Sequence, residues 1–365
     1  MKSTLVSAFI FALIPFNFHP FTKPVPVTKP LTGNVFIITI DGFRWQEIFS
    51  GADSILINME SATPDTSTLK AMYWDDSPEE RRKKLMPFFW NVISRKGCIY
   101  GNRKFDSRVD VMNPFQKSYP GYHEMFTGNI DRAIHSNDPI PDPDENILEF
   151  LNKQKSFEGK VAAFTSWDVF PYILNEKRSS LVINSGYDNQ QGDKLSSEQK
   201  MINRVQDEIV REKKSTRYDE LTFLSAKEYI VASQPKVLLL GLGETDEFAH
   251  EGRYDLYLQQ ANSVDQMIAA LWHMVQTMPG YKDNTTFIIT TDHGRGSRTG
   301  KWDSHGEWIR GSSNTWMALI GPGIKARGEI HGGEQMYQAQ VAQTIAMLLG
   351  NYFPGEDAAP AISLR

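Results

Sequence analysis

The stretch FIITTDHGRG, residues 287–296, decides the fold. It opens with an uninterrupted apolar, β-branched run and ends in an aspartate, a histidine and two glycines around an arginine. Continuous runs of this kind are typical of strands that are buried on both faces. The polar residues therefore stand where a buried strand ends, which is where open α/β sheets bind their ligands.

Further runs of the same character recur along the chain, separated by segments with helical spacing. Strands are predicted at 34–40, 160–165, 236–243, 285–291 and 315–321, and helices at 81–96, 144–154, 196–214, 218–233, 254–278 and 334–350. Strands that alternate with helices predict an α/β fold, a three-layer αβα sandwich around a mostly parallel sheet.

Composition restricts both the partners and the number of domains. The chain has 365 residues, of which 40% are hydrophobic, a net charge of −5 and no long basic stretch. We therefore expect a single catalytic domain over residues 32–365 and no binding of nucleic-acid polymers through their phosphates.

The N-terminal residues predict export. Residues 5–16, LVSAFIFALIPF, form an apolar run of the length found in secretory signals, and no clear cleavage site follows. Residues 1–18 are predicted to be a signal peptide or an N-terminal membrane anchor, and the Pro-rich residues 19–31 a tether. Cys98 is the only cysteine, and an exported chain without disulfides favours a bacterial periplasm or envelope.

Carboxylates and histidines follow three of the predicted strands. They are Asp41, Asp246, His250, Asp292, His293 and, shortly after, His305. Each could be an ordinary helix cap, ion pair or loop histidine. Found together at one sheet edge they predict a metal centre, because these side chains are ligands of divalent cations.

Local turns and charge support this hypothesis. Gly42 allows a turn after the first strand, and Gly294 and Gly296 are expected to turn the chain so that Asp292 and His293 reach one centre. The positive charge of two divalent ions would exceed the negative charge of three aspartates. The centre could therefore also bind a negatively charged alkoxide and a phosphoryl group. Zinc suits the imidazoles, and manganese would tolerate the same set.

A nucleophile is available in KSYPGYHEMFTG, residues 117–128. Ser118 precedes Tyr119 and Pro120, and proline fits the first turn of a helix. Ser118 is therefore interpreted either as a helix N-cap or as a hydroxyl nucleophile at the positively polarised end of that helix. Both roles are compatible with the same position.

The order of these residues resembles the alkaline phosphatase superfamily, and the chain is most similar to its type I phosphodiesterase/nucleotide pyrophosphatase branch. The segments DGFRW, KSYPGYHEMFTG, TDEFAHEG and TDHG carry the resemblance, which spans residues 34–322. It implies an alkaline-phosphatase-like fold, in-line attack by Ser118, a covalent phospho-enzyme and release by a metal-activated water. It also implies two zinc ions, one held by Asp246, His250 and His305, the other by Asp41, Asp292, His293 and Ser118.

Two positions depart from that branch: Ser118 replaces its usual Thr, and Gly121 its usual Asn. The resemblance also implies an oxyanion-binding Asn after the nucleophile, for which Asn137 is the nearest match and Asn129 a poorer one. Arg44, within DGFR, is a further candidate for substrate binding.

The expected substrate is a small phosphate ester, with phosphodiester or pyrophosphate bonds favoured because uncharged residues follow Ser118. A phosphomonoesterase, a sulfatase-like enzyme and a phosphoglycerate-mutase-like enzyme are alternatives. Tyr122 stands where sulfatases have Arg, and the segment between Ser118 and Asp246 is too short for the domain inserted in such mutases. A metal-free binding protein is disfavoured because every expected ligand is present.

Overall fold

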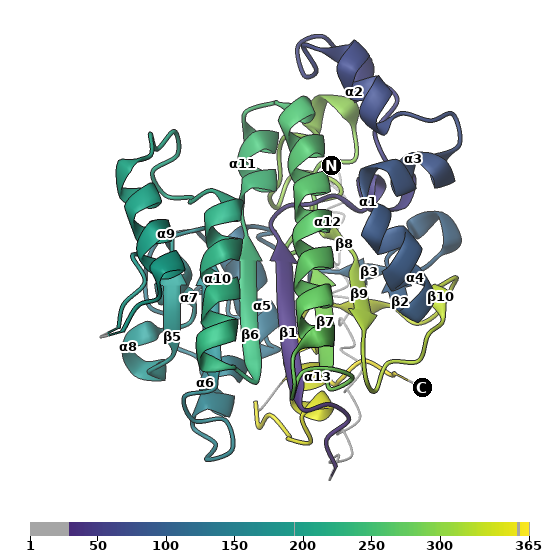
Figure 1. Cartoon of the computed structure of the whole chain (residues 1–365). Coiled ribbons are helices and arrows are strands. Elements are labelled where there is room, and N and C mark those ends of the chain that lie inside the picture. Colours follow the sequence, from purple (N-terminus) through teal and green to yellow (C-terminus); the bar gives the residue numbers. More distant parts are fainter. Residues whose placement is uncertain (1–28, 193, 356–357, 365) are drawn as a thin grey trace, which may run out of the picture.

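The computed structural model describes residues 29–192, 194–355 and 358–364. Its centre is a sheet with the strand order β10-β2-β9-β7-β1-β6-β4-β5 (Figure 1). The strands are β1 Asn34–Ile40, β2 Gly97–Tyr100, β4 Val161–Thr165, β5 Val182–Ser185, β6 Val237–Leu242, β7 Thr285–Thr290, β9 Met317–Ile320 and β10 Gly328–Glu329. The five strands from β7 to β5 run parallel, and β9 is antiparallel to β7 and β2.

A small second sheet has the order β11-β3-β8. Its strands are β3 Val109–Asp110, β8 Asn314–Thr315 and β11 Met336–Tyr337.

Strand β1 shows why the centre of the large sheet is buried on both faces. All of its residues are buried, and Val35 pairs with Val237 of β6 and Thr286 of β7. Phe36 and Ile38 belong to one apolar core, and Val35 and Ile37 to the other. Successive side chains thus point alternately into the two cores, as strand geometry requires.

Helices cover both faces. One core takes residues from α1 Trp45–Ser50, α2 Thr66–Tyr73, α3 Pro78–Leu85, α10 Asp219–Ser233, α11 Glu244–His250 and α12 Tyr254–Thr277. The other takes residues from α5 Ser118–Thr127, α6 Ile147–Asn152, α7 Phe170–Ile173 and α13 Gln340–Leu348. In Figure 1, α10 and α12 lie in front of the sheet and α5, α6 and α13 behind it. The predicted three-layer αβα sandwich is confirmed.

The predicted helix at 81–96 is interrupted. Helix α3 ends at Leu85, a π-helical turn covers Phe89–Ile93, and α4 covers Ser94–Lys96. Pro87 cannot donate a backbone hydrogen bond. Asp265 of α12 accepts the N–H groups of Phe88 and Phe89 at 2.7 and 2.8 Å. A tertiary contact therefore replaces the helical bonds.

Other predicted boundaries also shift. The expected strand at 315–321 divides at Trp316, a buried residue whose Nε1 donates to the carbonyl of Phe43 at 2.8 Å. The helix expected at 334–350 begins only at Gln340, because β11 precedes it. Helix α9 covers Ser197–Glu208 and α8 covers Glu176–Ser179.

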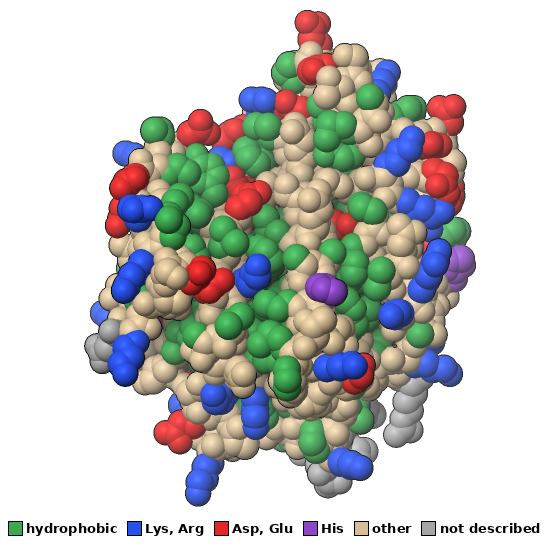
Figure 2. Space-filling model, in the orientation of Figure 1, with side chains coloured by type: hydrophobic (Ala, Val, Ile, Leu, Met, Phe, Trp, Pro, Cys, Tyr) green, Lys and Arg blue, Asp and Glu red, His purple; other side chains and the backbone are tan. Residues whose placement is uncertain are grey.

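The predicted signal peptide or anchor, residues 1–18, and most of the tether, residues 19–31, lie outside the described residues. At the end of the tether, Leu31 N donates to the carbonyl of Leu348 at 2.8 Å, so the chain already contacts the fold there. Within the described part of the chain, no helix combines the length and apolar character needed to cross a bilayer. Figure 2 shows acidic and basic side chains interspersed over the face that carries α10 and α12.

Candidate active site

The strand order brings the predicted metal ligands to one edge of the sheet. Strand β1 lies between β6 and β7 and runs parallel to both, so the carboxyl ends of all three strands coincide. Asp41 directly follows β1, Asp292 and His293 follow β7, and α11, which carries Asp246, begins just after β6.

The first group consists of Asp41, Asp292 and His293, all of them buried. Nε2 of His293 lies 3.6 Å from Oδ1 of Asp41 and 3.4 Å from Oδ2 of Asp292. Nδ1 of His293 lies 2.9 Å from the carbonyl oxygen of Gly294, which places the proton on Nδ1. Nε2 therefore presents its lone pair to the two carboxylates.

Two oxygens of this group are buried and, among the described residues, have no hydrogen-bond partner: Oδ1 of Asp41 and Oδ2 of Asp292. The other oxygen of each carboxylate accepts a hydrogen bond. Tyr122 donates to Oδ2 of Asp41 at 3.2 Å, and Gly42 N donates to Oδ1 of Asp292 at 3.1 Å. Burial raises the pKa of Asp41 well above its usual value and that of Asp292 to about 6, and the charge of Asp246 adds to both shifts.

The second group consists of Asp246, His250 and His305. Nε2 of His250 lies 3.1 Å from Oδ2 of Asp246 and 3.1 Å from Nε2 of His305. Because Asp246 and His250 are four residues apart in α11, they project from one face of that helix. The ring of His305 stacks on that of His293 with centroids 3.8 Å apart, so the two groups adjoin.

The imidazoles of His293 and His305 stay neutral at neutral pH. Burial lowers the pKa of His293 to about 4 and that of His305 to about 3, and the neighbouring His293 adds to the shift of His305. Neutral imidazole is the form that binds metal ions. Both histidines are therefore ready to act as ligands at neutral pH.

Arg295 belongs to this centre, although no role could be assigned to it from the sequence. Its Nη2 contacts Oδ1 of Asp246 and, at 3.0 Å, the backbone oxygen of the same residue, while Nη1 donates to the Asp303 carbonyl at 2.6 Å. Burial would raise the pKa of Asp246, but Arg295 and the bond from His250 outweigh it and lower that pKa well below the usual value. The only signal in the sequence is its place in TDHGRG.

Ser118 lies at the first residue of α5 and faces the first group. Its Oγ is 3.3 Å from Nε2 of His293, and the residue is 4% exposed. The N-cap of α5 is Lys117, which makes no side-chain capping bond. The interpretation of Ser118 as an N-cap is therefore wrong, and its hydroxyl is available for chemistry.

The turn before Ser118 is held by buried hydrogen bonds. Gln116 has φ +52°, a left-handed conformation that is uncommon for a residue with a side chain. Its N–H donates to Oδ1 of Asn113 at 2.8 Å, and its carbonyl accepts from Nδ1 of His305 at 2.9 Å. Glu124 of α5 accepts in turn from the backbone N–H and the side chain of Asn113 at 2.8 and 2.9 Å. This network joins the turn to both α5 and the second group.

Gly42 is required in this site by conformation and by space. Its φ is +57°, and a Cβ there would lie 2.5 Å from Oδ1 of Asp246 and 3.2 Å from Cε1 of His293. The expected turn after β1 is thus confirmed, and it places the backbone directly against the metal ligands.

At the other glycines of the site, neighbouring backbone lies too close to leave space for a side chain. Gly294 and Gly296 do not have positive φ, so the expected sharp turn is not the reason for them. A Cβ on Gly294 would lie 2.2 Å from the carbonyl oxygen of Asn314, and one on Gly296 2.0 Å from that of Lys301. Gly121 similarly lets α5 pack on the backbone of Asp292, whose carbonyl oxygen a Cβ would approach to 2.5 Å. A residue with a side chain would therefore not fit at position 121 without a shift of this backbone.

The substrate-binding candidates lie in three different places. Oδ1 of Asn137 accepts from Tyr119 N at 3.0 Å, which puts Asn137 beside the start of α5. Asn129 follows the last turn of the same helix, at the end away from Ser118. Arg44 is buried and paired with Glu47, its Nε 2.8 Å from Oε2.

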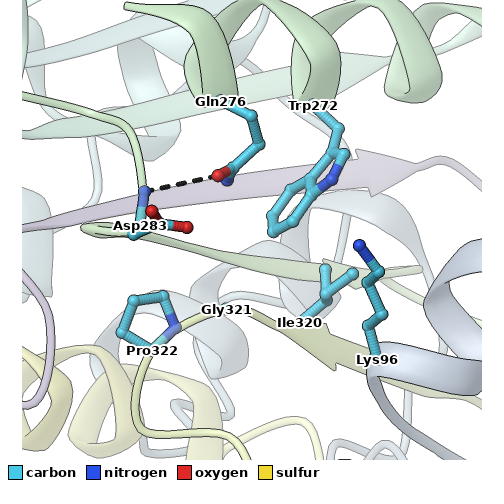
Figure 3. Close-up of a pocket in the computed structure, with 7 residues that line it drawn as sticks. All are labelled: Lys96, Trp272, Gln276, Asp283, Ile320, Gly321 and Pro322. Carbon is cyan, nitrogen blue, oxygen red and sulfur yellow. Dashed lines mark hydrogen bonds between the residues drawn. The ribbon is translucent and has the colours of Figure 1, made fainter. Parts of the chain in front are cut away.

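A cavity of about 280 Å³ lies elsewhere, between Trp272, Asp283 and Pro322 (Figure 3). Asp283 precedes β7, so this cavity is at the amino end of the strand, opposite the acidic and histidine residues. Its position separates it from the site.

The donor set fits a pair of divalent cations. Two buried carboxylate oxygens without partners and neutral imidazoles with inward lone pairs are arranged as ligands would be. One ion would lie among Asp41, Asp292, His293 and Ser118, and the other among Asp246, His250 and His305.

Comparison with known proteins agrees with this geometry. The sequence profile of the type I phosphodiesterase / nucleotide pyrophosphatase family matches residues 91–349. No curated protein sequence matches the chain. The proteins whose solved structures are similar include an alkaline phosphatase and a 2-O GAG sulfatase.

Three solved structures illustrate the shared fold. A protein of the alkaline phosphatase superfamily from Vibrio parahaemolyticus is 13% identical, with 95% of this chain and 74% of that chain covered and a TM-score of 0.55. The alkaline phosphatase PafA is 11% identical, with 91% and 98% covered and a TM-score of 0.61. The lipoteichoic acid synthase LtaP from Listeria monocytogenes is 11% identical, with 94% and 79% covered and a TM-score of 0.54.

The profile covers more than half of the chain and includes the turn before Ser118, α11 and the residues after β7. With the fold and the two groups of side chains already in place, the chain belongs to the type I phosphodiesterase / nucleotide pyrophosphatase family.

Proposed function

We propose that the protein is a two-metal hydrolase of phosphate esters in which Ser118 is the nucleophile. The observation that carries this proposal is the position of Ser118 Oγ, 3.3 Å from Nε2 of His293, at the start of a ten-residue helix. The N-terminal end of a helix favours negative charge, so α5 directs its positive end toward an incoming phosphoryl group.

The residues around Ser118 have distinct tasks. Asp41, Asp292 and His293 would hold one divalent cation, and Asp246, His250 and His305 the other. Bound there, the cations would favour the ionised form of the Ser118 hydroxyl and offset the charge of the phosphoryl group. The hydrogen bond that Nδ1 of His305 donates to the Gln116 carbonyl keeps Nε2 of that histidine directed inward. Asn137, whose Oδ1 accepts from Tyr119 N, would donate its side-chain amide to a phosphoryl oxygen.

The reaction then follows from attack at phosphorus. Ser118 Oγ loses its proton to water and forms a bond to phosphorus as the ester bond on the opposite side breaks, and the leaving group departs with its electron pair. In a second step water adds to phosphorus and the Ser118 oxygen leaves and takes up a proton. Mass spectrometry of protein quenched during turnover should find a phosphoryl adduct on Ser118, which for a diester substrate still carries the second alcohol. Its absence under conditions of burst kinetics would contradict the covalent route.

We favour diesters over monoesters because the Lys and Arg side chains that could meet a phosphoryl group already have partners. A monoester carries one more negative charge, which specialised enzymes meet with an Arg or Lys. Lys117 Nζ donates to the carbonyl of His135 at 3.1 Å, Arg44 is paired with Glu47, and Arg295 with Asp246. None of the three is directed at a phosphoryl oxygen on Ser118.

The ester preference is tested with matched chromogenic substrates. After reconstitution with zinc, kcat/KM should be higher for bis-(p-nitrophenyl) phosphate or a nucleotide p-nitrophenyl ester than for p-nitrophenyl phosphate. A clear advantage for the monoester would overturn the diesterase assignment and leave the metal centre untouched. Manganese reconstitution in parallel shows which ion supports turnover.

We also propose that the protein is exported, because residues 5–16 have the character of a secretory signal. Fractionation of producing cells and N-terminal sequencing would distinguish a cleaved signal from a retained membrane anchor. Recovery of the intact chain only in the cytoplasm would contradict export.

A further inference from the structure

A further cluster of potential metal ligands includes a residue of α5, five positions after Ser118. His123 of α5 meets Asp142 and Asp144 of the following loop, and one ligand atom from each lies within 4.8 Å of the others. None of the three belongs to the two groups around Ser118. His123 and Asp142 are buried, whereas the side chain of Asp144 is 47% exposed, so solvent reaches the cluster from one side.

Asp142 fixes the orientation of the imidazole. Its Oδ2 lies 2.7 Å from Nδ1 of His123, and its Oδ1 accepts from Asp144 N at 2.9 Å. A carboxylate at Nδ1 holds the proton on that nitrogen and leaves a lone pair on Nε2. This is the arrangement in which an aspartate supports a metal-bound histidine through its far nitrogen.

The other nitrogen of His123 has no hydrogen-bond partner in the described part of the chain. Nε2 is buried and makes no hydrogen bond to any described residue, although the side chain is only 1% exposed. It is directed at Oδ2 of Asp144, 3.7 Å away. That separation exceeds a hydrogen bond, yet two ligands of a tetrahedral zinc ion, each at about 2.1 Å, lie about 3.4 Å apart. A cation between the two atoms would give both a partner.

Among the described residues, no Lys or Arg forms an ion pair with His123, Asp142 or Asp144. Arg178 contacts the same loop, but its donors go to Glu149 and to the backbone carbonyls of residues 142–144. Burial raises the pKa of the Asp144 carboxyl, His123 opposes the shift, and the negative charges of Asp142 and Asp131 add to it. The cluster thus combines carboxylates with a lone pair on Nε2 of His123.

From this geometry we infer that His123 and Asp144 bind a third divalent transition-metal ion, with Asp142 orienting the histidine and water completing the coordination. An imidazole with a carboxylate suits zinc or manganese better than magnesium or calcium. The ion would tie α5 to the loop that carries Asn137. The inference is independent of the reaction at Ser118.

The test compares metal content of the full chain after equilibration with zinc and removal of free metal. Asp144→Asn should lower the zinc content by about one ion per chain relative to the wild type. This difference should not depend on how far the two groups around Ser118 are occupied by metal. Asp138→Asn, an exposed aspartate of the same loop whose Oδ2 accepts from Ser136 Oγ at 2.7 Å, is the control and should not change it. Equal content in the wild type and Asp144→Asn would overturn the inference.

A second variant and a crystal experiment distinguish the loss of this site from misfolding of the variant. His123→Asn keeps a donor near Nδ1 for Asp142 and removes the ligand nitrogen, so it should lose the same ion with an unchanged circular dichroism spectrum. Crystals of the wild type soaked in zinc should show an anomalous peak between Nε2 of His123 and Oδ2 of Asp144. The absence of that peak would also overturn the inference.

Discussion

Ser118 Oγ and His293 Nε2 lie 3.3 Å apart, although 175 residues separate them in the chain. One stands at the start of α5 and the other just after β7, so helix packing on the sheet sets their distance. Gly121 permits that packing, because any side chain there would meet the backbone of Asp292.

Replacement of Ser118 by Ala should abolish turnover while the fold and metal content persist. The hydroxyl caps no helix, so the loss of about 1 kcal/mol typical of a removed N-cap is not expected. We expect kcat to fall by at least about 10³-fold. Steady-state kinetics, thermal melting and metal analysis measure the three quantities. Ser179→Ala, which removes another buried hydroxyl, is the control and should keep full activity.

His293 and His305 should differ in their effect on metal binding. His293 lies within ligand distance of both groups, whereas His305 joins only the group around Asp246. His293→Ala should therefore weaken both catalytic ions, and His305→Ala mainly one. Metal analysis after dialysis measures the difference, with the exposed His273 replaced by Ala as control. Identical losses in the first two variants would contradict the assignment of ligands.

Gly42→Ala should damage the metal centre more than it damages the fold. The left-handed backbone alone costs a residue with a side chain about 1–2 kcal/mol. The added Cβ would also displace Asp246 and His293. Gly252→Ala is a matched control, since its φ is +71° and its Cβ would meet nothing within 4 Å. Both variants should lose similar stability in urea, and only Gly42→Ala should lose metal and activity.

Metal binding to the first group should weaken as the pH falls through about 6. In the metal-free protein the pKa of Asp292 is raised to about 6 and that of Asp41 well above its usual value, both chiefly by burial. Below those values protons occupy the carboxylates and compete with the cation. His293, with a pKa of about 4, stays neutral throughout this range.

Calorimetric titration of zinc between pH 5 and 8, in buffers of different ionisation enthalpy, measures the protons that binding releases. Release should be greatest near and below pH 6 and should diminish as the pH rises above the two carboxylate pKa values. An affinity that is independent of pH over this range would contradict the prediction.

Arg44→Met should lower stability and leave KM unchanged. The substitution strands Glu47, which is fully buried, and breaking a buried pair costs about 3–5 kcal/mol. Adding Glu47→Gln removes the stranded charge and keeps an acceptor for Tyr254, whose hydroxyl lies 3.0 Å from Oε1. The double variant should regain part of the stability in urea denaturation. A large rise in KM with stability intact would restore the substrate-binding role expected for Arg44.

The long apolar strands and the ligands at their ends could be predicted because each is a local signal. Strand β1 is largely apolar and buried throughout, and Asp41 follows it directly. Short strands such as β2 carry too few residues for a pattern, and they form because β9 and β10 pair with them. The break at Pro87 depends on Asp265, a residue of another helix.

The parts of the site that were missed depend on tertiary contacts. Arg295 matters only because the fold places Asp246 beside it, and Glu124 because the turn before Ser118 folds back onto α5. Asn113 and Gln116 have no distinguishing pattern in the sequence. Their roles follow from a left-handed residue whose bonds connect separate elements.

The place of β1 in the middle of the sheet has a consequence for synthesis. The bond between Gly42 and Asp292 spans 250 residues, so β1 lacks its β7 neighbour until most of the chain has been made. At about 5–20 residues per second, the ribosome needs about 12–50 s to close that interval. During this time a largely apolar strand has an open edge, which invites pairing with other chains. The nascent protein should therefore depend on a chaperone that masks residues 34–40 until β7 emerges.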